Sequence, residues 1–169
     1  MRFIDALLPE FDHEIATTRR VLERVPEDRF TWKPHTKSMS LGELAQHVAA
    51  IPMWGRVTLM QPDLDVAFSP PAPPPATRAD VLEAFDARSA DTRAALVGMT
   101  DAELLAPWAL KRGGHTIFSM PRAGAWRSFV MNHLIHHRGQ LTVYLRMAGV
   151  PLPSIYGPSA DEPGELETS

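Results

Sequence analysis

The chain has 169 residues, 44% of them hydrophobic, a formal net charge of −3 and no cysteine. Disulfides, thiolate metal ligands and a cysteine nucleophile are therefore excluded, and the scattered basic residues of a mildly acidic chain give no reason to expect nucleic-acid binding. No apolar run approaches the ~20 residues of a membrane span, and Asp5 and Glu10 argue against a signal peptide, so we expect a cytoplasmic protein without membrane contact.

The first helix is predicted over residues 2–25, where apolar residues recur at the three- and four-residue spacing of one buried helix face. Pro9 interrupts this pattern, so we expect the first turn or two to be kinked or separate. His13 lies away from the apolar face and His35 lies in the following loop. Both are interpreted as exposed surface histidines.

A second helix is predicted to begin at Ser40, because an S-x-x-E capping box precedes a periodic apolar run there. The apolar pattern extends to Met60, with a bend expected at Pro52, and His47 lies on the apolar face. The proline-rich segment 61–76 that follows is predicted to be a stiff crossover on the surface.

A third helix is predicted from Thr77, which begins another capping box, and a short helical turn is predicted after Thr100. Residues 108–121 break the helical pattern around a pair of glycines, which indicates a small hairpin or an ordered loop. The last helix is predicted from Arg122 to Ala148. It is apolar almost all round, which suggests a second contact surface and hence a homodimer, with Met131 and Ile135 as the candidate dimer surface.

Four amphipathic helices predict an all-α fold, a four-helix bundle in which the long connection between the second and third helices forms a crossover. Residues 1–157 are assigned to this single domain. Residues 158–169 are assigned to a C-terminal tail, whose last ten or so residues are expected to be mobile.

Two histidines stand out in the last helix. At ~100° per residue, His137 lies about 40° from His133 on the same helix face, and that face also carries apolar residues such as Trp126 and Val130. Polar rings in the middle of a core-facing stripe require partners. Together with His47 they form a three-histidine set on two helices, which is the composition of an open, catalytic type of metal site.

Competing interpretations of these histidines are weaker. Leu134 follows His133, so the H-E-x-x-H motif of metalloproteases is absent, and no suitably placed E-x-x-H pair supports a di-iron bundle. Each histidine could separately be a satisfied core residue, but three such burials would each cost ~1–3 kcal/mol without compensation. A shared ion is favoured, and zinc, nickel, cobalt or iron(II) could accept three nitrogens.

Residues beside the three histidines receive more modest assignments. His136 is interpreted as flank packing rather than as a donor to the site. Gln140 and Tyr144 share the face of His133 and could orient a ligand or simply pack, and packing is favoured for Tyr144. Arg138 lies about 140° from His133 around the helix, so we expect it at the surface or in a dimer contact.

Three passages give the chain a family resemblance. They are the N-terminal helix with its loop to TWKP, the stretch SLGELAQHVAAIPMW, and the stretch MNHLIHHRGQLTVYLRMAGVPLPSIYGPSADE. Together they resemble the DinB/YfiT-like superfamily of metal-dependent proteins. The resemblance implies a four-helix bundle with a crossover, usually dimeric, and a divalent metal ion, most often nickel or zinc. His47, His133 and His137 occupy the positions of its three histidine ligands.

The resemblance also bears on activity. Some members are S-transferases or isomerases that use low-molecular-weight thiols, whereas many have no assigned activity. We therefore expect a divalent-metal-dependent enzyme, a thiol-dependent S-transferase or a hydrolase, that acts on a small electrophilic molecule. Since the chain has no cysteine, any thiol must be a cosubstrate. The alternative is a non-enzymatic metal-binding bundle with a stress-response or sensor role.

Overall fold

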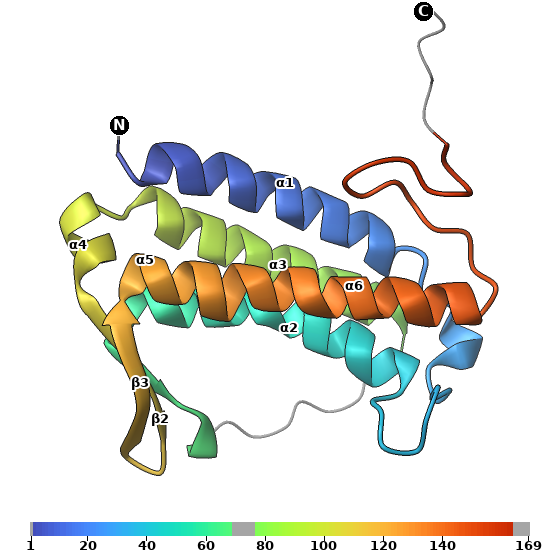
Figure 1. Cartoon of the computed structure of the whole chain (residues 1–169), viewed down its shortest axis with the longest axis horizontal. Coiled ribbons are helices and arrows are strands. Elements are labelled where there is room, and N and C mark those ends of the chain that lie inside the picture. Colours follow the sequence, from blue (N-terminus) through green and yellow to red (C-terminus); the bar gives the residue numbers. More distant parts are fainter. Residues whose placement is uncertain (1, 69–76, 164–169) are drawn as a thin grey trace, which may run out of the picture.

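The computed structural model describes residues 2–68 and 77–163, and most of them are helical (Figure 1). Its long helical segments are α1 (Ile4–Leu22), α2 (Leu41–Met60), α3 (Arg78–Val97), and a last segment made of α5 (Arg122–Ala125), a π-helix (Trp126–Met131) and α6 (Asn132–Met147). Short helices occur at Glu27–Arg29, at Val66–Phe68 and at α4 (Asp101–Leu105). No helix in the described ranges combines the length and apolar character that a membrane crossing requires.

The long helices pack lengthwise against one another, with α1 and α2 each contacting both α3 and α6. Helices α2 and α3 run in the same direction. Met60 at the end of α2 lies beside Gly98 at the end of α3, whereas the backbone N–H of Arg78 at the start of α3 bonds to Glu27, which precedes α2. The connection between α2 and α3 therefore has to return along the length of the molecule, as the predicted crossover requires. Residues 69–76 of that connection lie outside the described ranges.

Three helix starts follow the predicted capping boxes. Ser40, Thr77 and Thr100 each accept a hydrogen bond from the backbone N–H three residues later, and the acidic side chain at that position bonds back to the cap. Pro9 does not separate the first turns of α1, which is one helix. Pro9 is exposed and close to the helix start, so its ring faces solvent and it removes a single backbone hydrogen bond.

The predicted hairpin at 108–121 is confirmed. Strand β2 (Pro107–Arg112) pairs antiparallel with β3 (His115–Pro121). The turn between them has positive φ at both Gly113 and Gly114, a conformation that favours glycine.

The structure also contains a third strand, so the expected all-α class is only partly right: a small sheet accompanies the helices. Strand β1 (Asp63–Asp65) pairs in parallel with β2 and completes a three-stranded sheet in the order β1-β2-β3. The carboxylate of Asp65 accepts hydrogen bonds from the backbone N–H groups of Gly113 and Gly114 at 2.9 and 2.7 Å. Three residues inside a proline-rich segment are too few to show strand alternation, which is why the sequence did not predict β1.

The side of the last helix that faces the protein core is centred on leucines rather than on histidines. Leu134, Leu141 and Leu145 are at most 1% exposed and pack in the main hydrophobic cluster with residues of α1, α2 and α3. Met131 is fully buried in a second cluster with Trp126, so its assignment to a dimer surface is wrong. The core side of α6 lies about 100° around the helix from His133, whereas the sequence predicted it at His133.

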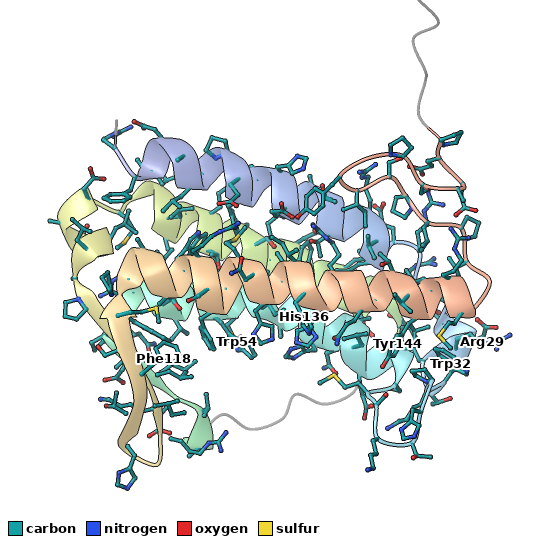
Figure 2. The ribbon with its side chains drawn as sticks, in the orientation of Figure 1. Arg29, Trp32, Trp54, Phe118, His136 and Tyr144 are labelled. Atoms are coloured by element: carbon teal, nitrogen blue, oxygen red, sulfur yellow. The ribbon has the colours of Figure 1, made fainter. Side chains whose placement is uncertain are left out.

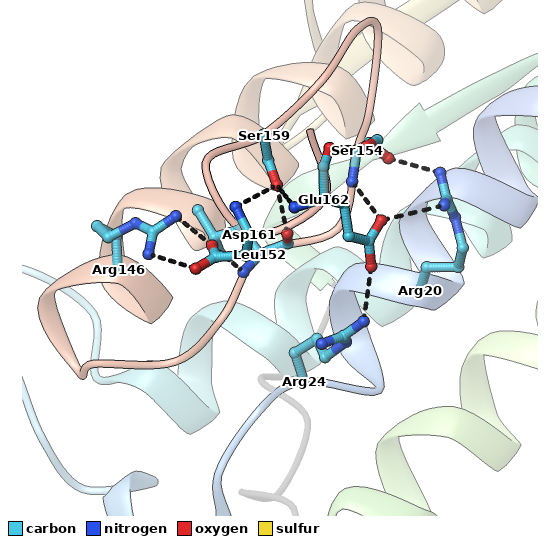
Figure 3. Close-up of polar contacts among 8 residues, drawn as sticks. All are labelled: Arg20, Arg24, Arg146, Leu152, Ser154, Ser159, Asp161 and Glu162. Carbon is cyan, nitrogen blue, oxygen red and sulfur yellow. Dashed lines mark hydrogen bonds and ion pairs between the residues drawn. The ribbon is translucent and has the colours of Figure 1, made fainter. Parts of the chain in front are cut away.

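The C-terminal segment runs back over the helices and is tied to them by charged groups (Figure 3). Asp161 pairs with Arg146 of α6, and Glu162 accepts a hydrogen bond from Arg24, which follows α1, at 2.9 Å. Glu162 also accepts a hydrogen bond from the backbone N–H of Ser154. The predicted tail 158–169 is thus held against the helices at Asp161 and Glu162, and residues 164–169 lie outside the described ranges.

Candidate metal centre

The structure brings His47, His133 and His137 together. The Nε2 atoms of His47 and His133 are 3.0 Å apart, and each of the three rings offers a nitrogen within 4.8 Å of the other two. His47 comes from α2 and the other two from successive turns of α6. Nitrogens that share one tetrahedral zinc ion lie roughly 3.3 Å apart, given Zn–N bonds of about 2.0–2.1 Å. The three imidazole nitrogens are therefore a donor set that could hold one divalent cation.

These histidines lie at the edge of the core rather than in its middle. All three are partly buried, whereas the leucines of α6 that face the core are fully buried. This corrects the expectation that His133 and His137 occupy the centre of the apolar stripe. A position at the edge keeps one side of the cluster open to solvent, which a site for an exchangeable ligand requires.

The surroundings keep the imidazoles neutral. Burial lowers the pKa of His47 and of His133 to about 4, and repulsion from His137 acts in the same direction on both. Burial also lowers the pKa of His137, against an opposing effect of its hydrogen bond to Gln140. Only a neutral imidazole has a lone pair to offer a metal ion, so the lowered pKa values favour the protonation state that a metal site needs.

A hydrogen bond to Gln140 determines which nitrogen of the His137 ring carries the proton. The Oε1 atom of Gln140 lies 2.7 Å from Nδ1 of His137. An amide oxygen can only accept, so Nδ1–H of His137 donates and Nε2 keeps its lone pair. Of the two roles considered for Gln140, orientation of a ligand is the one that the structure supports.

Aromatic side chains wall the cluster on one side. The Trp54 ring meets His47 and His133 edge-on, with centroids 5.5 and 5.0 Å away, and Phe129 stacks on Trp54 at 5.5 Å. Trp108 of β2 packs on Phe129 in turn, which links the sheet to the site. In Figure 2, a row of labelled side chains follows α6 from the hairpin towards the start of α2: Phe118, Trp54, His136, Tyr144, Trp32 and Arg29.

The sequence analysis did not identify this wall, although its spacing carried a signal. Trp54 lies seven residues, or two helical turns, after His47, so the two share a face of α2. Phe129 lies four residues before His133. The π-helix Trp126–Met131 ends just before Asn132 and holds Phe129; such segments are frequent at functional sites.

The remaining histidines stay outside the cluster. His136 is exposed and meets the ring of His137 edge-on at 4.8 Å between centroids, which agrees with flank packing. His13, His35 and His115 are exposed as well.

Arg138 is not at the surface, which corrects its predicted place. It is 1% exposed and forms an ion pair with the buried Glu14 of α1, with 2.6 Å between Nη1 and Oε2. The angle of about 140° from His133 was right, but that direction leads into the bundle, because the core lies to that side of the histidines.

Comparison with known proteins agrees with this architecture. The family model described as the DinB family matches residues 2–167. The uncharacterized protein YrdA of Bacillus subtilis (strain 168) is 27% identical over 163 residues, which cover 94% of this chain and 91% of YrdA.

Two solved structures share the fold. A DinB-like protein from Bacillus cereus ATCC 10987 has a TM-score of 0.71 at 20% identity, covering 92% of this chain and 98% of that one. The DinB-like protein YjoA from Bacillus subtilis has a TM-score of 0.68 at 20% identity, covering 89% of this chain and 96% of that one. Because the family model spans nearly the whole sequence, the chain belongs to the DinB family.

Proposed function

We propose that the protein is an enzyme that holds a divalent metal ion, nickel or zinc, on His47, His133 and His137. Its proposed reaction is transfer of a thiol to a small electrophilic molecule, or hydrolysis of such a molecule. The observation that carries the proposal is the convergence of three neutral, partly exposed imidazoles on one point. Among the described residues, the group holds no cysteine or carboxylate, so an ion there would keep positions open for a reactant, as catalytic sites do.

A metal ion in this place would supply Lewis acidity and lower the pKa of a coordinated group. The chain's own residues do the rest. Gln140 holds the proton on Nδ1 of His137 and so keeps Nε2 available. Trp54 and Phe129 exclude water from one side of the cluster and offer apolar surface to the organic part of a reactant. Since the chain has no cysteine, a thiol nucleophile would enter as a low-molecular-weight cosubstrate.

A second candidate is a non-enzymatic, metal-stabilised bundle with a sensor or stress-response role. It is favoured by one feature of the site, the origin of its ligands on two different helices. An ion bound by His47 of α2 and His133 of α6 would cross-link these helices, and binding energy would then appear as folding stability.

Metal titration of the purified, chelator-treated protein tests the premise that both candidates share. We expect one equivalent of Ni²⁺ or Zn²⁺ to bind to the wild type, and His47→Ala, His133→Ala and His137→Ala each to bind far more weakly. His35→Ala removes an exposed loop histidine and serves as the matched control. Undiminished metal content in all three site variants would rule out both candidates.

Activity assays distinguish the enzyme from the non-enzymatic bundle. The metal-loaded protein is assayed with a panel of low-molecular-weight thiols and electrophilic acceptors, and separately with hydrolysable esters and amides. Turnover that is lost in His133→Ala supports the enzyme. Silence across metals and substrates, combined with a large rise in thermal stability on metal binding, favours the structural module.

A further inference from the structure

A polar cluster built on a buried ion pair holds α6 on the side away from the three histidines. Its members are Arg138 of α6, Glu14 of α1 and Tyr156 of the C-terminal segment. The side chains of Arg138 and Glu14 are 1% and 6% exposed. Burying an ion pair costs desolvation that its attraction often fails to offset, so such pairs are weak evidence for stability and can instead specify geometry.

The cluster is a closed triangle of contacts. Nη1 of Arg138 lies 2.6 Å from Oε2 of Glu14, and Nη2 of Arg138 donates to the hydroxyl of Tyr156 at 2.6 Å. That hydroxyl in turn donates to Oε1 of Glu14 at 2.8 Å. Each member thus holds the other two, and three separate parts of the chain meet in one place.

The triangle lies next to the candidate metal centre along the chain. Arg138 directly follows His137 and projects about 100° away from it around the helix. Helix α6 is therefore held from the α1 side while its histidines face His47 on α2. A rotation of α6 by roughly 5° would move a nitrogen about 6 Å from the axis by ~0.5 Å, more than the ~0.2 Å tolerance of a metal–ligand distance.

We propose that Tyr156 is a positioning residue for the metal centre and acts through Arg138 and Glu14. The inference rests on the proposed function, because it presupposes that the three histidines bind a metal ion. The segment that carries Tyr156 is held at Asp161 and Glu162 (Figure 3), so the hydroxyl comes from a segment with its own contacts to Arg146 of α6 and to Arg24, which follows α1. The C-terminal segment is thereby part of the metal centre although it provides none of the three histidines.

Tyr156→Phe is the variant of choice. It removes the hydroxyl and keeps the ring, and Tyr156 is 65% exposed, so little packing is lost. The probe is Co²⁺, for which the dissociation constant and the visible absorption spectrum of the loaded protein are measured. We expect roughly tenfold weaker binding, the lower end of the range for groups that orient ligands, together with a changed spectrum.

Arg127→Met is the matched control. Arg127 pairs with Glu10, so this second ion pair also joins α1 to the last helical segment, but at an exposed position. We expect its Co²⁺ affinity and spectrum to equal those of the wild type. Glu14→Gln should weaken binding as Tyr156→Phe does, and the double variant should lose less than the sum of the two, because both changes open the same triangle.

The outcomes are distinguishable. A wild type that binds none of Co²⁺, Ni²⁺ and Zn²⁺ overturns the proposed function and this inference with it. A wild type that binds, beside a Tyr156→Phe protein of equal affinity and spectrum, overturns the inference alone. Equal losses in Tyr156→Phe and Arg127→Met would show general loosening of the helices and would also overturn it, as would strictly additive losses in the double variant.

Discussion

Gln140 accepts a hydrogen bond from Nδ1–H of His137 at 2.7 Å, one turn back along α6. Because the two residues are neighbours on one helix, the contact is set by local geometry. It selects one tautomer of the ring and points the Nε2 lone pair into the cluster. The orientation of this candidate ligand is therefore encoded within four consecutive residues.

Removal of this acceptor should weaken metal binding. Gln140→Leu leaves the imidazole free to adopt the other tautomer, and we expect about 10- to 100-fold lower Ni²⁺ or Zn²⁺ affinity. Gln140→Glu keeps an acceptor at the same place and should retain affinity. Competition titration against a chromophoric chelator measures both variants, and equal affinity of Gln140→Leu and wild type would contradict the assigned role.

Metal-free stability should fall as the pH is lowered. The pKa of His47 and of His133 is about 4 in the folded protein, below the ordinary value of 6.5. Between these values the unfolded chain binds protons that the folded protein does not, so stability is complete above pH 6.5 and is lost as the pH falls from 6.5 towards 4. Urea midpoints at several pH values measure the slope, which should shrink in His47→Ala and stay unchanged in His35→Ala.

Metal binding should tolerate mild acid for the same reason. Three ordinary histidines would compete with protons below pH 6.5, whereas burial lowers the pKa of His47 and of His133 to about 4 and lowers that of His137 as well. We expect affinity to persist below pH 6.5 and to fall steeply towards pH 4. Titrations across this range check the prediction, and a loss of affinity centred at pH 6.5 would show that the rings are not shielded.

The aromatic wall should account for much of that shielding. Trp54→Ala removes the ring that meets His47 and His133 edge-on. Water then reaches both imidazoles, so the pKa of each should rise towards its ordinary value. NMR titration of the histidine Cε1–H signals measures the change. Trp32→Ala is the control, because Trp32 packs on Tyr144, and both lie on the opposite side of His136 from Trp54 along α6 (Figure 2). It should leave both pKa values unchanged.

The sequence predicted the features that depend on local chemistry. The capping boxes at Ser40, Thr77 and Thr100 each use a cap and a residue three positions later, so both partners were visible in the sequence. The proximity of His133 and His137 was also predictable from the sequence, since one helical turn separates them. His47 joined them because it lies on the buried side of a helix that was itself predicted.

The features that depend on tertiary packing were missed. The direction of the core relative to His133 is set by the helices that pack on α6, so the sequence alone did not show that Arg138 points inwards. Its partner Glu14 is 124 positions away along the chain, and Tyr156 belongs to a segment without regular structure. Strand β1 is defined by its pairing with β2, more than 40 residues later in the chain, so its own three residues did not predict it.

Alanine substitutions at two helical glycines, Gly55 and Gly139, are expected to change stability in opposite directions. A Cβ at Gly55 of α2 would lie 2.8 Å from Thr92 Cγ2 and 3.1 Å from Trp126 Cζ3, so this glycine lets α2 approach its neighbours closely. A Cβ at Gly139 of α6 would meet nothing within 4 Å. The same substitution therefore has different consequences at the two sites.

Gly55→Ala should destabilise the protein by about 1–3 kcal/mol, because overpacking exceeds the gain in helix propensity. Gly139→Ala should stabilise it by about 0.5–1 kcal/mol, because an exposed helical glycine costs conformational entropy and Ala fits the same backbone. Urea unfolding of the two metal-free variants beside the wild type measures both changes. Stabilisation by Gly55→Ala would mean that α2 lies farther from Thr92 and Trp126 than the structure places it, and the wall that Trp54 forms from the same helix would then have to be reconsidered.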